Sequence, residues 1–512
     1  MIIKKSEKKI AGAFRILIVS LAVLAQLFLL ALLVIELKHN SVFIYLLLEV
    51  VGLIEVLVLV DKNNNSSYTI AWLIIILILP VFGYLLYVLW GRTGTHGRKS
   101  RKNQEIILRG MKWLKKDPNV QSEFQRCHPS RKRITGYLEQ EGFPLYKDTK
   151  SKYYGLGELQ FEDMIADLEK AKRFIFLEYF ILGEGQLWER IHGILKRKAA
   201  QGVEVRLMYD DLGSIVTAPN KLIKKLESEH IRAISFNPVH KYISRLYINY
   251  RNHQKIAVID GNIGYTGGTN LADEYANLYA KHGHWKDAAI RLEGDAVWSL
   301  TVTFLQMWEI ESGIKEDYLN YQPAIKITGD GFYQPFSDGP VNNPHNPAEA
   351  MYRQLISNAK EYVYITTPYL VIDDLMIDVL CTAAMGGTDV RIITPKIWDH
   401  WYVHMVTRSN YGRLMEAGVR IYEYTPGYIH AKIIISDDDH AITGSINMDY
   451  RSFNLHFEDG VWICGAPVLE DIKKDITDTF EVCEEIALNE WKRRPWYIKI
   501  LQAFLRLFAP LF

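Results

Sequence analysis

The sequence predicts an α/β protein of two pseudo-symmetric α/β/α halves with mainly parallel sheets, preceded by an N-terminal transmembrane helical region. Three observations support this prediction. Strand-like runs rich in β-branched and aromatic residues alternate with helical segments, twice in the same order. One motif at residues 252–270 recurs at 429–447, and the first 90 residues are mostly apolar.

The N-terminal region contains three apolar stretches. Ile16–Ile35 and Ile70–Trp90 are each long enough to cross a bilayer core of roughly 30 Å. Val42–Val60 carries Glu49 and Glu55, and carboxylates are costly in the middle of a membrane. We therefore expect residues 1–92 to form a transmembrane anchor with two full spans and a partial one. A cleavable signal peptide is the alternative for the first stretch, which lacks a small-residue cleavage site.

Basic residues flank this anchor on both sides. They are Lys4, Lys5, Lys8, Lys9 and Arg15 before it, and Arg92, Arg98, Lys99, Arg101 and Lys102 after it. The positive-inside rule places both flanks in the cytoplasm, which requires an even number of crossings. We expect a multi-pass protein of the cell membrane with a cytoplasmic catalytic part.

Charge and cysteine content narrow the class of protein. The formal net charge is +1, from 60 basic and 59 acidic residues, so no global charge favours nucleic acid as a partner. Four cysteines, Cys127, Cys381, Cys464 and Cys483, lack paired spacing. Their scatter argues against a disulfide framework or a zinc knuckle and is compatible with a reducing compartment.

The internal repeat extends beyond the motif. "FIFLEYFIL" (174–182) matches "YVYITTPYLV" (362–371), "GVEVRLMYDD" (202–211) matches "GTDVRIITPK" (387–396), and "HIRAISFNP" (230–238) matches "GVRIYEYTP" (418–426). We expect a linker over residues 93–150, a first half over 151–320, a second half over 321–490 and a tail over 491–512. A pseudo-twofold axis would bring equivalent positions of the two halves together.

The repeated motif reads His-x-Lys, four residues, Asp, six residues, then Gly-[Gly/Ser]-x-Asn. Its matched members are His253 and His430, Lys255 and Lys432, Asp260 and Asp437, Gly267 and Gly444, and Asn270 and Asn447. The His and the Lys are two residues apart on a predicted strand, so they point to the same face. A buried structural histidine would explain one copy, but two complete copies indicate a shared site.

Two imidazoles, two ammonium groups and two amides around one space suit a phosphodiester. Lys255, Lys432, Asn270 and Asn447 would bind the non-bridging oxygens as negative charge develops. One imidazole would attack phosphorus while the other protonates the departing oxygen. We include Asp260 and Asp437 in the catalytic motif, although their position directly after the strands is typical of structural anchors.

Each imidazole needs a partner that fixes its tautomer. We expect each partner to come from the same half, Asp287 for His253 and Glu458 for His430. His282 and His284 suggest a zinc site, but no cysteine or carboxylate pattern accompanies them, so we expect neither metal nor cofactor.

The doubled motif resembles that of the phospholipase D superfamily, over about residues 150–490. Several longer stretches resemble bacterial cardiolipin synthases: "AWLIIILILPVFGYLLYVLWGR" (71–92), "LEYFIL" (177–182), "NYRNHQKIAVIDGNIGYTGGTNLADEY" (249–275), "EAGVRIYEYTPGYIHAK" (416–432) and "GSINMDYRSFNLHFE" (444–458). The resemblance implies two phospholipase D-like halves that join two phosphatidylglycerol molecules into cardiolipin and release glycerol. It also implies a phosphohistidine on His253, with His430 as acid and then base and without metal; the two roles could be exchanged.

Two further segments suggest contact with anionic membrane lipids. In the tail "WKRRPWYIKILQAFLRLFAPLF" (491–512), Ile498, Leu501, Leu505 and Phe508 share one helical face, as in helices that lie in the headgroup plane. The alternative for this tail is a helix that closes the domain core. The stretch "HKYISRLYINYR" (240–251) interleaves basic and tyrosine side chains, which suits anionic headgroups, nucleic acid or a solvated helix face.

The same histidines would also serve other activities. Water as acceptor would make the protein a phospholipase D-type hydrolase, and another alcohol would make it a different phosphatidyltransferase. A membrane-tethered nuclease would need a long basic groove, which the balanced charge disfavours. A non-enzymatic membrane scaffold would have no use for two intact motifs.

Overall fold

The computed structural model describes residues 98–238, 249–340 and 345–511, together with 50, 53–54, 56–59, 66–79, 83–84, 86–87 and 91. The chain divides into a small unit, formed mainly by residues 1–92, and a large unit that holds nearly all the rest. The predicted span Ile16–Ile35 lies outside the described residues, as does most of the basic stretch 240–251.

The small unit contains helix α3 (Ser66–Ile78). The Tyr68 hydroxyl donates a hydrogen bond to the Gly91 carbonyl at 2.6 Å, and the Trp72 ring meets the edge of the Tyr87 ring at a centroid distance of 5.4 Å. Among the residues described, no helix is both long enough and apolar enough to cross a membrane.

The first half of the large unit contains one seven-stranded sheet. Its strands run in the order β1 (Thr149–Tyr154), β9 (Ala289–Gly294), β7 (Ile263–Gly267), β6 (Ile256–Ile259), β2 (Phe174–Tyr179), β3 (Glu204–Asp210) and β4 (Arg232–Phe236). Helices α8 (Gly157–Lys170), α9 (Gln186–Ala200) and α10 (Leu222–Ser228) cover one face, and α12 (Val297–Ser312) packs on the other. Alternate residues of β2 enter the two cores, Phe174 and Phe176 on the α12 side, Ile175 and Leu177 on the α8 side.

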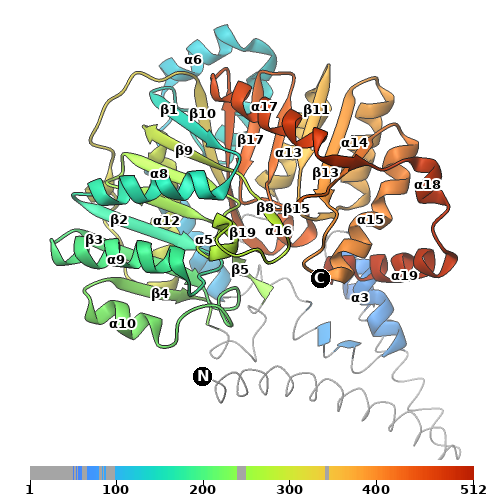
Figure 1. Ribbon diagram of the computed structural model, residues 1–512, viewed down its shortest axis with the longest axis horizontal. Helices are drawn as coiled ribbons and strands as arrows, with labels where there is room; N and C mark the ends of the chain where they lie inside the picture. The colour runs from blue at the N-terminus through green and yellow to red at the C-terminus, as the bar shows by residue number, and fades with distance from the viewer. Residues whose placement is uncertain are drawn as a thin grey trace, which may run out of the picture. The chain divides into compact units, whose positions relative to one another are not determined.

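The second half repeats this plan. Its sheet runs β10 (Phe332–Asp338), β19 (His456–Cys464), β17 (His440–Gly444), β16 (Ile433–Ser436), β11 (Tyr362–Thr366), β13 (Asp389–Pro395), β14 (Arg420–Tyr424) and β20 (Cys483–Glu485). The accompanying helices are α13 (Pro347–Asn358), α14 (Asp374–Met385), α15 (Trp401–Glu416) and α17 (Val468–Glu481). Figure 1 shows the two sheets beside each other.

The prediction of mainly parallel sheets is wrong. In each half only three neighbouring strands are parallel, β2, β3 and β4 in the first and β11, β13 and β14 in the second. The other pairs within the two sheets are antiparallel. The strand after each His-x-Lys returns through a tight turn, and a turn this short can only join antiparallel strands.

Two short strand pairs connect the halves. β5 (Arg251–Asn252) pairs in parallel with the start of β19, and β15 (Gly427–Ile429) pairs in parallel with β8 (His284–Lys286). In each half, the segment just before the motif histidine therefore pairs with a strand of the other half. The expected pseudo-twofold relation is visible in this exchange.

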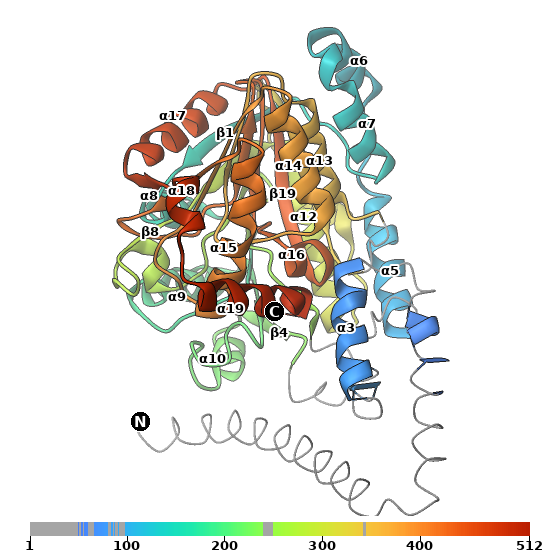
Figure 2. The same cartoon turned by 90° about the vertical axis from the view of Figure 1, so that its right-hand side faces the viewer.

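Residues 98–145, predicted as part of a linker, fold against the large unit. They form α5 (Arg98–Met111), α6 (Pro118–Cys127) and α7 (Lys132–Gln140), which run along one side of the unit in Figure 2. The Phe124 ring meets the Trp462 ring at a centroid distance of 5.8 Å, and buried Arg131 pairs with Asp437 at 3.1 Å. These helices contribute buried side chains to the core of the large unit.

The C-terminal tail contains α18 (Leu488–Lys492) and α19 (Trp496–Leu507). The face predicted to enter lipid packs on protein instead: Leu505 is buried with Val371 and Val406, and Leu501 lies against the same cluster. A second apolar face points outward, where Trp496 is 73% exposed and Phe504 56% exposed. The helix is therefore apolar on two faces, whereas the sequence pattern predicted only one apolar face.

Candidate active site

The two motif histidines lie where the halves meet. The His253 backbone N–H donates to the Phe457 carbonyl at 2.9 Å, and the His430 N–H donates to the Lys286 carbonyl at 2.7 Å. Both bonds continue the exchanged strand pairs β5–β19 and β8–β15. Each residue is only 6% exposed, so both imidazoles are buried at the interface between the halves.

The carboxylates that hold the histidines are exchanged in the same way. The His253 Nδ1 lies 2.9 Å from the Glu458 carboxylate, and the His430 Nδ1 lies 2.7 Å from Asp287. The prediction that each partner comes from the same half is therefore wrong. The exchange follows from the strand pairing, because the segment that ends at His253 runs beside the strand that carries Glu458.

Backbone and hydroxyl groups next to the motif support these carboxylates. A Cβ atom on Gly268 would lie 2.0 Å from an Asp287 carboxylate oxygen, so this position needs glycine for the close approach. At the matching position of the second half, the Ser445 hydroxyl donates to Glu458 instead. The two copies of the motif therefore accommodate the equivalent carboxylates with different residues, a glycine in the first half and a serine in the second.

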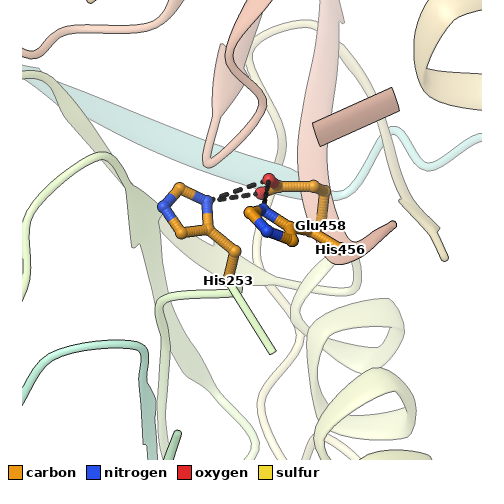
Figure 3. Close-up of side chains that lie close together, drawn as sticks. All are labelled: His253, His456 and Glu458. Carbon is orange, nitrogen blue, oxygen red and sulfur yellow. Dashed lines mark hydrogen bonds and ion pairs between the residues drawn. The ribbon is translucent and has the colours of Figure 1, made fainter. Parts of the chain in front are cut away.

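A third imidazole, that of His456, lies beside His253. The two ring centroids are 5.3 Å apart, and the His456 Nδ1 lies 3.6 Å from the Glu458 carboxylate (Figure 3). Nitrogen atoms of both histidines and a Glu458 oxygen fall within 4.8 Å of one another, a ligand set of the kind that holds zinc. No sequence pattern marks His456, because a lone histidine in a strand carries no spacing signal.

Both motif lysines are buried beside their histidines. Lys255 donates its ammonium to the His253 carbonyl, and Lys432 donates to the His430 carbonyl. Burial lowers the pKa of Lys255 to about 7 and that of Lys432 to about 8, although the Glu458 and Asp287 carboxylates act in the opposite direction. A bound phosphate would favour the charged form of both lysines.

Burial also keeps the two imidazoles neutral. It lowers the pKa of His253 well below its usual value, and the Lys255 and Lys432 charges add to this effect. Burial and Lys432 lower the pKa of His430 to about 4, while Asp287 acts to raise it. A neutral imidazole that donates Nδ1–H to a carboxylate presents an Nε2 lone pair, which is the form a nucleophile or base needs.

The two motif asparagines line the same cavity as the histidines. The Asn270 Oδ1 accepts a hydrogen bond from the Ile181 N–H at 2.9 Å, and its buried amide nitrogen has no hydrogen-bond partner among the described residues. The structure thus places both histidines and both asparagines around one space, as the repeat predicts for a shared site.

The motif aspartates lie elsewhere. Asp260 follows the strand and has a positive φ of 55°, and its carboxylate accepts the N–H groups of Lys172, Arg173 and Phe174. Asp437 does the same for Lys360, Glu361 and Tyr362. Seven extended residues, at about 3.3 Å each, put roughly 20 Å between each aspartate and its histidine. Their contacts are those of structural anchors.

A cavity of about 410 Å³ opens onto the histidines. Its walls combine apolar and aromatic side chains with a few polar ones; they include Phe180, Tyr275, Trp285, Tyr369, Tyr402, Val403, Asp399, Arg451 and, from the tail, Ala509. On the His430 side, the Tyr275 and Trp285 rings lie 5.5 and 5.6 Å from the imidazole centroid. This mixture suits a polar headgroup that carries an apolar body.

Two protein families match this chain, one over the two repeated halves and one over the N-terminal region. The family described as "Cardiolipin synthase, PLD-like domain" matches residues 164–290 and 352–481, which carry the two copies of the histidine and lysine motif. The family described as "Phospholipase D-nuclease N-terminal" matches residues 42–92.

Individual relatives cover most of the chain. A cardiolipin synthase of Geobacillus kaustophilus is 33% identical over 461 residues, 89% of this chain and 91% of that protein. A cardiolipin synthase of Staphylococcus aureus is 32% identical over 496 residues, 94% of this chain and 99% of that protein. The crystal structure of phosphatidylserine synthase from Haemophilus influenzae has a TM-score of 0.57 at 14% identity, over 74% of this chain and 97% of that one, and so shares the fold. This chain belongs to the cardiolipin synthase family of phospholipase D-like proteins.

Proposed function

We propose that the protein is a membrane-bound cardiolipin synthase that transfers the phosphatidyl group of one phosphatidylglycerol to another and releases glycerol. The observation that carries this proposal is the pair of buried, neutral imidazoles, each held by a carboxylate of the other half and both facing one cavity. The names of the relatives support the choice of lipid substrate.

The first step forms a phosphohistidine. The His253 Nε2 lone pair attacks phosphorus, and the phosphorus–oxygen bond to glycerol breaks. The bound phosphate anion raises the pKa of His430, which takes up a proton and passes it to the departing glycerol oxygen. Lys255 and Lys432 stabilise the charge on the non-bridging oxygens during this step.

The second step reverses these roles. A hydroxyl of the second phosphatidylglycerol loses its proton to His430 and attacks phosphorus, and the bond to His253 breaks. The product is cardiolipin, and His253 is neutral again. His430 returns to its starting state when it releases the acceptor's proton to solvent, which balances the proton that it took up in the first step. The assignment of His253 as the nucleophile rests on the family resemblance, since the geometry of the two histidines is nearly symmetric.

Access from a membrane fits the same proposal. Residues 42–92 match the N-terminal family, and the tail exposes an apolar face. We infer a multi-pass anchor within residues 1–92 and a catalytic unit on the cytoplasmic side, where the anionic headgroups of the inner leaflet supply the substrate. The tail over 491–512 would rest on the same surface.

Product analysis tests the proposal. Purified protein is incubated with phosphatidylglycerol vesicles, without added metal, and lipids and free glycerol are quantified. We expect cardiolipin and glycerol in equal amounts. Phosphatidic acid would mean that water is the acceptor and that the protein is a hydrolase, while a product formed only with another alcohol would mean a different phosphatidyltransferase.

Single substitutions connect that product to the site. We expect His253→Ala and His430→Ala each to lower turnover by at least about a thousandfold, as for the loss of a nucleophile or a general acid. The matched control is His345→Ala, because His345 is exposed, pairs with Glu141 and does not line the cavity. Retention of a tenth of the activity by either catalytic variant would refute the two-histidine mechanism.

A further inference from the structure

A basic side chain of the second half lines the cavity, and its counterpart in the first half is acidic. Four residues after the motif asparagines, the first half has Glu274 and the second half has Arg451. Glu274 pairs with Lys281 at 3.6 Å. Arg451 lies on the short helix α16 (Tyr450–Asn454) and lines the cavity beside the histidines. At this pair of equivalent positions, only the second half places a side chain on the cavity, and Asp449 of the same half lines it as well.

A hydrogen bond holds the Arg451 side chain in place, but no described carboxylate forms an ion pair with it. Its Nε donates to the His456 Nε2 at 3.2 Å, and within the described part of the chain its two terminal nitrogens have no hydrogen-bond partner. Arg451 also forms no ion pair within 4.0 Å with any described carboxylate. The nearby Asp449 is committed to capping α16, where it accepts the Ser452 N–H at 2.8 Å.

Asp210, a second acidic residue near Arg451, also has other partners. Asp210 is fully buried, lies 3.4 Å from Arg251 and accepts the Asn252 N–H at 3.0 Å. Asp449 and Asp210 attract the Arg451 charge from a distance, and burial lowers the pKa of Arg451 in spite of them. A half-buried guanidinium whose fork faces a cavity is an unfilled site for an anion.

The Arg451 guanidinium lies one side chain away from His253. His456 separates Arg451 from His253, and the two imidazole centroids are 5.3 Å apart. When two phosphatidylglycerols react, a glycerol joins their two phosphates through six bonds. At about 1.5 Å per bond in a zigzag chain, the two phosphorus atoms lie no more than about 8 Å apart. A second phosphate therefore has to sit beside the first, within this same cavity.

We propose that Arg451 binds the phosphodiester of the second, acceptor lipid, and that His456 acts as its positioning residue. This inference rests on the proposed function. It makes Arg451 the residue that favours an acceptor hydroxyl attached to a phosphate over water or a free alcohol. The first half offers no matching cation, because Glu274 occupies the equivalent position, so the acceptor phosphate binds on one side only.

The test compares two acceptors that use the same phosphohistidine. In phosphatidylglycerol vesicles with labelled free glycerol, cardiolipin formation needs a second phosphate, whereas exchange of labelled glycerol into phosphatidylglycerol does not. We expect Arg451→Gln to lower cardiolipin formation at least tenfold more than glycerol exchange. Arg451→Lys, which keeps the charge but not the fork, should give an intermediate ratio, and Glu274→Gln should leave the ratio unchanged.

A soluble acceptor separates phosphate recognition from contact with the membrane. In detergent-mixed lipid, we expect the wild-type protein to use glycerol phosphate in preference to glycerol, and Arg451→Gln to lose that preference. His456→Asn should reduce the preference without removing it.

The outcomes distinguish this inference from the proposed function. Equal loss of cardiolipin formation and glycerol exchange in Arg451→Gln would place Arg451 at the scissile phosphate or in the fold, and would overturn the inference. An unchanged ratio of the two activities would overturn it as well. Wild-type protein that exchanges glycerol but forms no cardiolipin would instead overturn the proposed function.

Discussion

At the scale of single residues, each motif histidine contacts a carboxylate from the opposite half. His253 contacts Glu458, and His430 contacts Asp287. The carboxylate fixes which ring nitrogen carries the proton, and loss of such a partner costs catalysis even where the imidazole itself remains.

This exchange gives a prediction that separates the two histidines. We expect Glu458→Gln to change the Nδ1 proton and nitrogen resonances of His253 while those of His430 stay in place, and Asp287→Asn to do the reverse. Each substitution should also lower turnover by about a hundredfold or more. Nuclear magnetic resonance of histidine-labelled protein measures both sets of signals. A response within the same half would contradict the exchanged pairing.

The lysines give a prediction about pH. Phosphate binding needs their charged forms, and their pKa values are lowered to about 7 for Lys255 and about 8 for Lys432. Their charge is therefore lost as pH rises, so kcat/KM should fall between about pH 7 and pH 9. Lys255→Arg keeps its charge at any of these pH values and should move the onset of the decline upward, towards the pKa of about 8 of Lys432, whatever its maximal rate. A profile that stays flat to pH 9 would refute this role of the lysines.

The sequence predicts some of these residues and misses others for a physical reason. His253, Lys255, Asn270 and their counterparts recur at fixed spacing, so they stand out as a motif. The partner of each histidine depends instead on strand pairs of two and three residues, which are too short to give a periodic pattern. His456 and Arg451 are single residues, and only three-dimensional contact relates them to the site.

At the scale of elements, the fold departs from the prediction where strand direction is concerned. Runs of β-branched residues show that strands exist, and β2, β3 and β4 are parallel because helices α9 and α10 connect them. The later strands are joined by short turns such as Asp260–Asn262, which enforce antiparallel pairing. Composition alone cannot show this, because both kinds of strand are buried on two faces here.

Helix α19 has one face packed on the protein and one face exposed. Its inner face packs on α15, and Ala509, which follows the helix, lies at the cavity wall. Its outer face exposes Trp496, Tyr497, Ile500, Phe504 and Leu507. A strictly surface helix would be polar on the outside. We infer that the outer face enters the headgroup layer of the membrane, in which large aromatic side chains are favoured.

Substitutions on the two faces should therefore have different effects. Trp496→Ser with Phe504→Ser should lower activity on vesicles at least fivefold more than on detergent-dispersed lipid, because only vesicle binding is lost. The matched control is Leu505→Ala on the inner face, which should cost about 2–4 kcal/mol of unfolding free energy and act equally on both substrates. Equal losses for the outer-face variant would show that this face serves the fold.

At the scale of the whole molecule, the prediction concerns the side of the membrane. Basic residues flank the apolar N-terminal region on both sides, so the catalytic unit should be cytoplasmic. Cys127 provides a natural probe, because its thiol is free and exposed in the large unit.

Labelling of Cys127 by a membrane-impermeant maleimide should be absent in intact cells and appear once the cells are opened. A Cys127→Ser variant controls for the less exposed cysteines, Cys381 and Cys483. Labelling in intact cells would place the catalytic unit outside and would require an odd number of crossings.

The exchange of strands between the halves also bears on how the chain is made. The first half leaves the ribosome with His253, Lys255 and Asp287 already in place, but Phe457, Glu458 and His430 have yet to be synthesised. Until β19 pairs with β5, His253 lacks both its backbone partner and its carboxylate. A nascent or truncated chain that ends before β19 therefore lacks the contacts that hold His253, so we expect it to be inactive until the second half has been synthesised.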